Sequence, residues 1–484
     1  MTKSLLAALA SFLFAITISA HAQTFTTLVT LTTNGNGENP LSPLVQGFDG
    51  NLYGTTFGGG PGFGTFFQLT LSGTLTPLYS FCQNYNDNYA CPDGAYPQGL
   101  VALGTDSNFY GVTQGGYYSS TGNGTVYKIT PAGALTTLHT FCALTGCADG
   151  EYPTLGLTLA RSGNFYGLSN APEDSSAYYG QAFEISSSGA FHDVLTVCPN
   201  TLCPADAGPI ASLLLSSSGA FVGPGPGAGD GSSPGALYSM SASGVPTLIY
   251  SFCDDSTCHD GGGSNRTPMA QSSTGEIYGT FAEGGAGAYC TESGTCGTAF
   301  EVAPTGGGSF TKLHDFCSEA GCADGANPGA LILASDGNYY GTTLGGGKHG
   351  YGTLFRITSA GHFAVVHNFS TTDGRAPTGI ALLQGTDGNL YGATDQTIYR
   401  VSLGLAPFVK TVMNSGRVGD TVIILGNNLT GSTGVTFKGI AAAFTVVSDT
   451  EITATVPSGA TTGTIKVVTP TATLLSNVAF QVLQ

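Results

Sequence analysis

Acidic residues at one recurring position are the first feature of this chain that could do chemistry. Each precedes a glycine, and most reach a proline soon after, as in Asp149-Gly-Glu-Tyr-Pro153. The series is Asp93, Asp149, Asp260, Asp324 and Asp373, with Asn36 and Asp206 at the matching place in two further units. Carboxylates gathered on one face could bind a cation such as calcium. Asp-Gly is also a common turn pair whose carboxylate bonds its own backbone, so the sequence favours a turn and leaves a metal site as the alternative.

Histidines and glutamates also recur at equivalent positions. The residues are His139, His314 and His367 in one series, where Tyr79 and Tyr250 stand in other units, and Glu184 and Glu301 in another. Residues in different units are expected to lie apart, so these series do not form a Ser/His/Asp set or a pair of carboxylates. The sequence therefore names no catalytic residue.

The 12 cysteines fall into close pairs. The pairs are Cys82 with Cys91, Cys142 with Cys147, Cys198 with Cys203, Cys253 with Cys258, Cys290 with Cys296, and Cys317 with Cys322. Four pairs share a Cys-x4-Cys spacing, which predicts local disulfides formed in an oxidising compartment. Zinc is the alternative, but the pairs lack regular histidine partners and belong to different units.

These groups belong to a tandem repeat, and a recurring patch of six residues marks each unit of it. The first copy, DGNLYG, runs from Asp49 to Gly54. The later copies are DSNFYG at Asp106, SGNFYG at Ser162, SGAFVG at Ser218, TGEIYG at Thr274, DGNYYG at Asp336 and DGNLYG at Asp387. A period of this size is typical of solenoids, arrays and propellers.

Each unit contains four short β segments and nothing that is typical of a helix. In the second unit we expect strands within 100–103, 109–113, 124–130 and 135–141. β-branched and aromatic residues fill these segments, and Gly, Pro, Asn or Asp stand between them. Seven units of four strands predict an all-β fold, a seven-bladed β-propeller over residues 23–404, in which radial closure leaves only short edges.

The two ends of the repeat region complement each other. The last unit stops at 397–402, which matches a third strand and has no fourth strand after it. Residues 24–33 resemble the fourth-strand series, so we expect the N-terminal strand to complete the last blade. The alternative is an open β array with an unpaired N-terminal strand.

The first residues indicate export. Lys3 precedes an apolar run over 5–20, and Ala20-His21-Ala22 before Gln23 fits a signal-peptide cleavage site, so residues 1–22 are predicted to be a secretory signal peptide. A Gln rather than a Cys after the cut argues against a lipid anchor. No later stretch approaches the ~20 apolar residues of a membrane span. The expected location is extracellular or on the cell envelope.

The net charge of the chain limits the classes of partner that it can bind. Lys and Arg number 13 against 30 Asp and Glu, a formal net charge of -17. Such a surface repels phosphate backbones and anionic membranes. We therefore expect no nucleic-acid partner.

From about Pro407 the period disappears and another pattern begins. Its landmarks are Gly419 to Leu429, Gly434 to Gly439, Ser448 to Pro457 and Gly463 to Val468. Together they resemble the IPT/TIG family over nearly all of 407–484. The resemblance implies an immunoglobulin-like β-sandwich over 405–484, used as a binding or spacer module.

The repeat region in turn resembles the GloVer-type tandem repeat, whose core is DGNLYGTT followed by a Gly-rich loop and G-T-[VL]-F-[KR]-[IL]-T. The best copies are Asp49 to Thr56, Asp336 to Thr343 and Gly352 to Thr358, and the fourth unit departs most, with Phe221-Val222 in place of the usual pair. The resemblance implies an exported protein, often on a cell envelope, and supplies no catalytic residues.

Tyrosines occur in the loops between second and third strands, which vary more than the rest of the unit. They are Tyr117, Tyr118, Tyr178, Tyr179, Tyr289 and Tyr351. Variable loops on a rigid scaffold commonly carry specificity, and exposed tyrosines suit stacking on sugars or packing against a protein. The alternative is that they cover their own Gly-rich loops.

These observations favour a non-catalytic binding or adhesion protein of the cell envelope or exterior, with a carbohydrate or protein ligand and no cofactor; calcium at the Asp-Gly loops is the alternative. One alternative is a carbohydrate-active or lyase-type enzyme that uses the central pocket. Another is a purely structural envelope protein. Polar residues that converge at the channel mouth and break the repeat would favour the enzyme.

Overall fold

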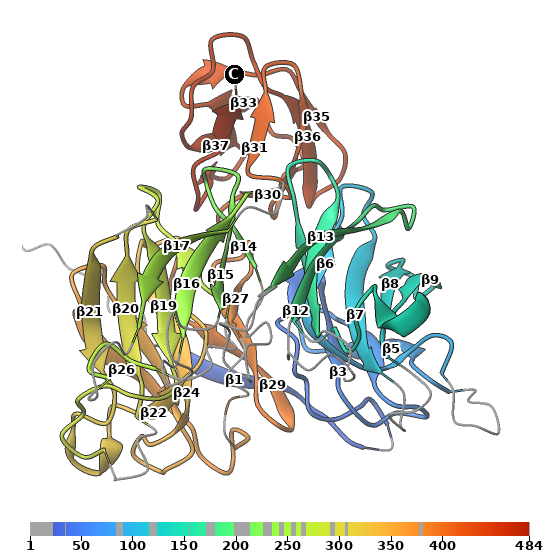
Figure 1. The fold of residues 1–484 in the computed structure, drawn as a ribbon. Coiled ribbons are helices and arrows are strands. Elements are labelled where there is room, and N and C mark those ends of the chain that lie inside the picture. The colour runs from blue at the N-terminus through green and yellow to red at the C-terminus, as the bar shows by residue number, and fades with distance from the viewer. Residues whose placement is uncertain are drawn as a thin grey trace, which may run out of the picture.

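The computed structural model describes residues 23–33, 35–83, 91–115, 123–153, 155–170, 180–197, 213–225, 235–241, 246–252, 258–262, 268–290, 296–304, 308–375, 377 and 381–483. The helical elements among them are two three-residue 3-10 turns, η1 (Thr145–Cys147) and η2 (Ala320–Cys322). All other regular elements are strands, so the predicted all-β class is confirmed (Figure 1). The predicted signal peptide, residues 1–22, lies outside the described residues.

The repeat region forms seven separate antiparallel sheets. The first contains β2 (Val45–Gln46), β3 (Leu52–Thr56), β4 (Thr65–Leu69) and β5 (Leu75–Ser80). The second contains β6 (Ala95–Leu103), β7 (Phe109–Gly115), β8 (Thr125–Ile129) and β9 (Leu135–Thr140). The third contains β10 (Leu157–Leu159), β11 (Phe165–Asn170), β12 (Gly180–Ile185) and β13 (Phe191–Val197). The fourth contains β14 (Leu214–Leu215), β15 (Phe221–Gly225), β16 (Ala236–Met240) and β17 (Pro246–Ser251).

The remaining three sheets follow the same order. The fifth contains β18 (Ala270–Gln271), β19 (Ile277–Phe281), β20 (Thr298–Val302) and β21 (Phe310–Asp315). The sixth contains β22 (Ala326–Pro328), β23 (Ile332–Leu333), β24 (Tyr339–Gly345), β25 (Thr353–Ile357) and β26 (Phe363–Asn368). The seventh contains β27 (Leu383–Gln384), β28 (Leu390–Ala393), β29 (Thr397–Ser402) and the N-terminal β1 (Thr24–Thr30).

The N-terminal strand is the fourth strand of the last sheet. β1 pairs antiparallel with β29, with Thr24 opposite Ser402 and Thr30 opposite Thr397. The prediction that the first strand completes the last repeat is confirmed. The two ends of the repeat region are therefore held together by a ladder of backbone hydrogen bonds.

The recurring patch is a turn fastened by its own side chains. The carboxylate of Asp49 accepts hydrogen bonds from the Asn51 backbone N–H at 3.1 Å, the Asn51 side-chain amide at 2.8 Å and the Tyr53 hydroxyl at 2.8 Å. Gly50 between them has a φ of 79°, which favours glycine. The same three bonds recur at Asp106, Asp336 and Asp387. The motif thus sets the geometry between the first and second strands of a sheet.

The aromatic pair of the patch joins neighbouring sheets. The fifth residue of one copy packs against the fourth residue of the next, in a stacked or tilted arrangement with ring centroids 3.9–4.3 Å apart. The pairs are Tyr53 with Phe109, Tyr110 with Phe165, Tyr166 with Phe221, and Tyr278 with Tyr339. Where a ring is missing, the equivalent residues still share a buried cluster. Those pairs are Val222 with Ile277, Tyr340 with Leu390, and Tyr391 with Leu52. Burial of these side chains between sheets contributes to the hydrophobic stabilisation at each junction.

The C-terminal region is a two-sheet sandwich. One sheet contains β30 (Lys410–Thr411), β32 (Thr421–Leu425), β36 (Glu451–Thr455) and β35 (Phe444–Val446). The other contains β34 (Ile440–Ala441), β33 (Gly434–Phe437), β37 (Ile465–Val468) and β38 (Thr473–Leu475). β31 (Ser415–Arg417) pairs in parallel with β39 (Gln481–Leu483). A single buried cluster, which includes Ile424, Phe437, Ile452 and Phe480, fills the space between the sheets.

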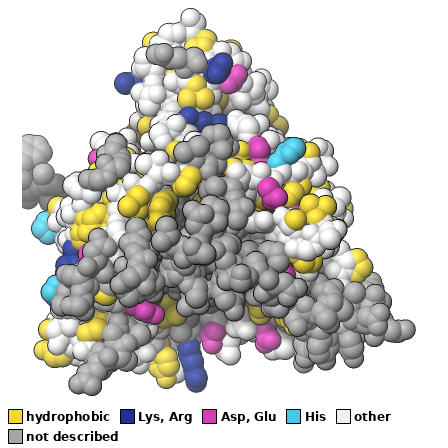
Figure 2. All heavy atoms as spheres, viewed as in Figure 1, with side chains coloured by type: hydrophobic (Ala, Val, Ile, Leu, Met, Phe, Trp, Pro, Cys, Tyr) yellow, Lys and Arg dark blue, Asp and Glu magenta, His cyan; other side chains and the backbone are white. Residues whose placement is uncertain are grey.

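The sandwich is seated on the repeat region at the turns between first and second strands. The Asn427 side-chain amide donates to the Thr386 hydroxyl at 2.8 Å, and the Thr450 hydroxyl donates to the Phe48 carbonyl at 2.6 Å. Arg161 donates to the Gln481 side chain. Figure 1 shows the sandwich, in red, above the sheets, and Figure 2 shows it as a narrow apex over a broader base. In the residues described, no helix has the length and hydrophobicity that a membrane span requires.

Candidate functional site

The aspartates of the Asp-Gly loops are held by donors from their own repeat. The buried carboxylate of Asp149 accepts hydrogen bonds from His139 Nε2 at 3.0 Å and from the backbone N–H groups of Ala143 and Leu144 at 3.1 and 3.2 Å. Asp324 has the same arrangement, with His314 Nε2 at 3.0 Å and the Ser318 hydroxyl at 2.8 Å.

The other members of the series repeat this geometry. Asp373 accepts from His367 Nε2 at 3.2 Å, Asp93 from the Tyr79 hydroxyl at 2.8 Å, and Asp260 from the Tyr250 hydroxyl at 3.2 Å. Asn36, at the matching place, accepts from the Thr32 backbone N–H at 2.7 Å. Asp206 lies outside the described residues. These hydrogen bonds are the ones expected if each Asp-Gly pair forms a turn, because a side-chain oxygen then bonds to groups of its own loop. Cation binding by these loops stays a prediction.

Burial and hydrogen bonding shift the pKa values of two of these groups. Burial lowers the pKa of His139 from its usual 6.5, although the nearby carboxylates of Asp149 and Asp193 oppose the shift. For Asp324, burial on its own raises the pKa. Hydrogen bonds from His314, from the Ser318 hydroxyl and from two backbone N–H groups outweigh burial, so the pKa of Asp324 lies below 3.8.

The three histidines lie on three different sheets, as the sequence predicts. His139, His314 and His367 belong to β9, β21 and β26. Each ring stacks on a phenylalanine of the next sheet along the chain, with centroids 3.9, 3.9 and 4.2 Å from Phe191, Phe363 and Phe25 respectively. Glu184 and Glu301 also lie apart, on β12 and β20. The histidines therefore pack between neighbouring sheets, and neither the histidines nor the glutamates converge on one site.

Four of the six predicted disulfides are present in the described residues. They are Cys82–Cys91, Cys142–Cys147, Cys290–Cys296 and Cys317–Cys322. Cys258 is also disulfide-bonded, and Cys198, Cys203 and Cys253 lie outside the described residues. The sulfurs of Cys142 and Cys147 come within 4.8 Å of a Glu151 carboxylate oxygen. Because these sulfurs are bonded to each other, they are not the thiolates that a metal needs.

The predicted tyrosines fall largely outside the described residues. Tyr117, Tyr118, Tyr178 and Tyr179 are among the residues that the structure does not describe. Tyr289 has half of its surface exposed. Tyr351 is partly buried, with the Arg375 guanidinium 5.8 Å from its ring centroid. Ligand binding by these tyrosines stays a prediction.

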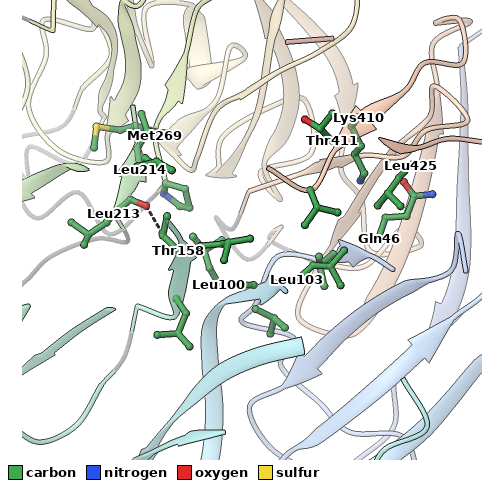
Figure 3. A pocket seen from close by; sticks show the side chains of 18 residues that line it. Gln46, Leu100, Leu103, Thr158, Leu213, Leu214, Met269, Lys410, Thr411 and Leu425 are labelled. Carbon is green, nitrogen blue, oxygen red and sulfur yellow. Dashed lines mark hydrogen bonds between the residues drawn. The ribbon is translucent and has the colours of Figure 1, made fainter. Parts of the chain in front are cut away.

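A cavity of about 350 Å³ lies where the sheets meet the sandwich (Figure 3). Its walls come from the first strands, or the residues just before them, of the first five sheets: Val45–Gln46, Leu100–Leu103, Leu157–Leu159, Leu213–Leu215 and Pro268–Met269. Its roof comes from the sandwich, through Lys410–Val412 and Leu425. Half of these wall residues are leucines, and Gln46 and Thr158 are the polar ones, so the cavity is apolar on most of its surface.

Lys410 is the charged residue among those that line this cavity. Its side chain is largely buried, and among the described residues no hydrogen bond or ion pair holds its ammonium group. Burial lowers the pKa of Lys410 to about 8, against the opposing effect of the Asp387 carboxylate. Sequence reasoning missed this residue because it lies outside the repeat. Nothing in the Val409-Lys410-Thr411 segment itself indicates that the sandwich covers the inner strands.

Comparisons with known sequences decide the family. A profile of the Gloeobacter/Verrucomicrobia repeat matches residues 84–292 and 259–404, well over half of the chain. The chain belongs to this repeat family. An IPT/TIG domain matches residues 407–482. Both resemblances inferred from the sequence are confirmed. A search of curated protein sequences found no match.

Among solved structures, the chain resembles a fungal alcohol oxidase of the AA5 family in complex with copper, with a TM-score of 0.52 and 12% identity over 94% of this chain and 100% of that one. It also resembles PorZ, a bacterial surface component of the type-IX secretion system of Porphyromonas gingivalis, with a TM-score of 0.49 and 12% identity over 94% of this chain and 61% of that one. A soluble aldose sugar dehydrogenase from Escherichia coli in the apo form gives a TM-score of 0.40 and 11% identity over 78% of this chain and 99% of that one. At these identities the likeness to the oxidase shows a shared propeller-like fold and nothing of its chemistry.

Proposed function

We propose that this repeat protein is an exported, non-catalytic binding protein of the cell envelope or exterior. We further propose that its seven sheets form a closed ring of seven blades, with the IPT/TIG domain seated on one end. One observation carries the proposal. The aspartates and histidines that recur in the repeat lie on separate sheets, and each of them makes the same structural contact in its own unit.

The central cavity supports a binding role over catalysis. General acid-base chemistry needs a titratable group and a partner placed within hydrogen-bond distance of the reacting atoms. The described lining residues offer leucines, two threonines, one glutamine and one lysine, and no carboxylate or imidazole. Lys410, whose pKa burial lowers to about 8, is the titratable group among them. The enzyme alternative would therefore need a second titratable group as its partner, which these lining residues do not supply.

The variable loops are the proposed recognition surface. The turns between first and second strands contact the sandwich through Phe48, Arg161 and Thr386. Because strands alternate in direction, loops between second and third strands emerge at the opposite end of each sheet. The loops that carry Tyr289 and Tyr351 are thus away from the sandwich and open to a partner. Stacking tyrosines of this kind suit a polysaccharide, and the alternative ligand is an envelope protein.

The test is a glycan-array and cell-wall binding assay of the secreted protein, with and without calcium.

A quadruple variant replaces Tyr117, Tyr118, Tyr178 and Tyr179 with alanine. Its affinity should fall by several hundredfold, because each lost stacking contact costs about 1 kcal/mol and the four losses are taken to add. A matched control is V447A, which trims a side chain of the sandwich that is 54% exposed. Binding unchanged in the quadruple variant would reject the loops as the site, and release of sugar fragments from the array would reject a non-catalytic role. Loss of binding without calcium would show that a cation is required, and loss of that calcium dependence in D149N would assign the cation to the Asp-Gly loops.

A further inference from the structure

We propose that the cavity beneath Lys410 is a second binding site, for a small molecule with an apolar body and one carboxylate. It is separate from the tyrosine loops and does not depend on what they bind. Three observations support this site: the shape of the cavity, the polar groups of its lining that already have partners, and the Lys410 ammonium, which has the Asp387 carboxylate in its surroundings but no ion pair or hydrogen bond among the described residues.

The cavity has the size and lining of a small-molecule site. Its volume of about 350 Å³ falls at the lower end of the range of about 300–1,000 Å³ that is usual for such sites. Leu100, Leu103 and Leu214 come from two different sheets and surround it (Figure 3). A tail of several methylene groups would bury its surface against these walls, at about 0.8 kcal/mol for each buried CH₂.

Most of the neutral polar groups of the lining already have partners. The Gln46 amide donates to the Gly50 carbonyl and the Thr386 hydroxyl, both at 3.1 Å, and its oxygen accepts from the Thr386 backbone N–H at 3.1 Å. The Thr158 hydroxyl donates to the Leu213 carbonyl at 2.5 Å. These hydrogen bonds join neighbouring sheets and turns of the repeat region, so the groups that make them are not available to a ligand.

Lys410 is different, because it comes from the sandwich and points into the cavity (Figure 3). An ammonium group taken from water without a partner is costly, and an anion bound beside it removes that cost. A single cation matches a ligand with a single negative charge, such as one carboxylate. A phosphate dianion would need more donors. Occupancy would also tie the sandwich to the first five sheets.

The test is titration calorimetry of octanoate against the full secreted chain, with octanamide as the uncharged probe of the same shape. Octanoate should bind the parent protein, and K410M should weaken it about ten- to hundredfold, the usual effect of losing a charge-assisted hydrogen bond. Octanamide should bind the parent and K410M equally. K466M is the matched control, since Lys466 is an exposed lysine of the same sandwich, and its octanoate affinity should equal that of the parent.

A variant that fills the cavity completes the test. L103F should weaken octanoate and octanamide together while far-UV circular dichroism stays that of the parent. If K410M does not fold, K410Q gives the same comparison. The proposal is overturned if the parent binds neither probe, if K410M binds octanoate like the parent, or if K466M loses binding to the same extent. The last two outcomes would mean that Lys410 only packs its methylene stem between the two domains.

Discussion

Leu52 of the first sheet and Tyr391 of the last sheet lie in one buried cluster. They are the fourth and fifth residues of the first and last copies of the recurring patch. At each of the other six junctions the same two positions meet within one cluster. The contact between the ends of the repeat region is therefore equivalent to the contacts inside it, which supports the closed ring that we propose.

The first prediction concerns this closure. Deleting Thr24–Thr30 removes β1 and exposes the edge of β29. It also removes the Phe25 ring that stacks on His367 and Tyr399. We expect loss of cooperative thermal unfolding, measured by circular dichroism, and greater aggregation. A deletion of the same length in the C-terminal sandwich should leave the transition of the repeat region in place, and a melting curve unchanged by loss of β1 would contradict ring closure.

Much of the fold could be predicted from the sequence because one local rule recurs. Asp49, Asn51 and Tyr53 form their turn through contacts within five residues, so the pattern that encodes the turn is visible in the chain. The pairing of β1 with β29 could also be predicted, because an unpaired third strand and an unmatched N-terminal strand complement each other.

The candidate site could not be predicted in the same way. Lys410 becomes notable only because the sandwich sits over the inner strands, and that placement depends on contacts between distant residues, such as Thr450 with Phe48. The role of the Asp-Gly loops was also ambiguous. Asp149 in a turn and Asp149 as a metal ligand have the same sequence signature, and the donors that engage its carboxylate, His139 among them, become visible only in three dimensions.

The second prediction concerns the recurring patch itself. Y340F removes the hydroxyl that donates to Asp336 at 2.9 Å and leaves the packing of the ring unchanged. The unfolding free energy should fall by about 1–2 kcal/mol, as expected for a partly buried hydrogen bond to a carboxylate. Urea denaturation measures it. The double variant D336N/Y340F should lose less than the sum of the two single changes, since both remove the same bond; additive losses would show that the bond contributes nothing.

The third prediction concerns the disulfides. Mass spectrometry of the non-reduced, digested protein should recover peptides that link Cys142 to Cys147 and Cys317 to Cys322. By loop entropy, each bridge across so small a loop contributes only about 2 kcal/mol, so C142S/C147S should fold with a modestly lower midpoint. Links between different repeats, or free thiols throughout the secreted protein, would contradict local pairing.

The last prediction uses the pKa of His139. Because the folded-state pKa lies below the unfolded value of 6.5, the unfolded chain binds more protons around and below that pH. The contribution of His139 to stability is therefore fully present above pH 6.5 and is lost as the pH falls through 6.5 toward the folded pKa. Asp324, whose pKa lies below 3.8, affects stability only at lower pH.

The repeat itself provides the matched variant. In the first unit Tyr79 takes the place of His139 and donates to Asp93 at 2.8 Å, so H139Y should keep the hydrogen bond to Asp149 without an imidazole that titrates. H139F should lose both the hydrogen bond to Asp149 and the imidazole that titrates. Urea midpoints measured at pH 8 should be similar for the parent and H139Y and lower for H139F, by about 1–2 kcal/mol in unfolding free energy. Between pH 7.5 and 5.5 the parent should lose more stability than H139Y. Parallel pH profiles for the parent and H139Y would show that His139 titrates alike in the folded and unfolded chain, and that its stacking on Phe191 does not exclude the proton.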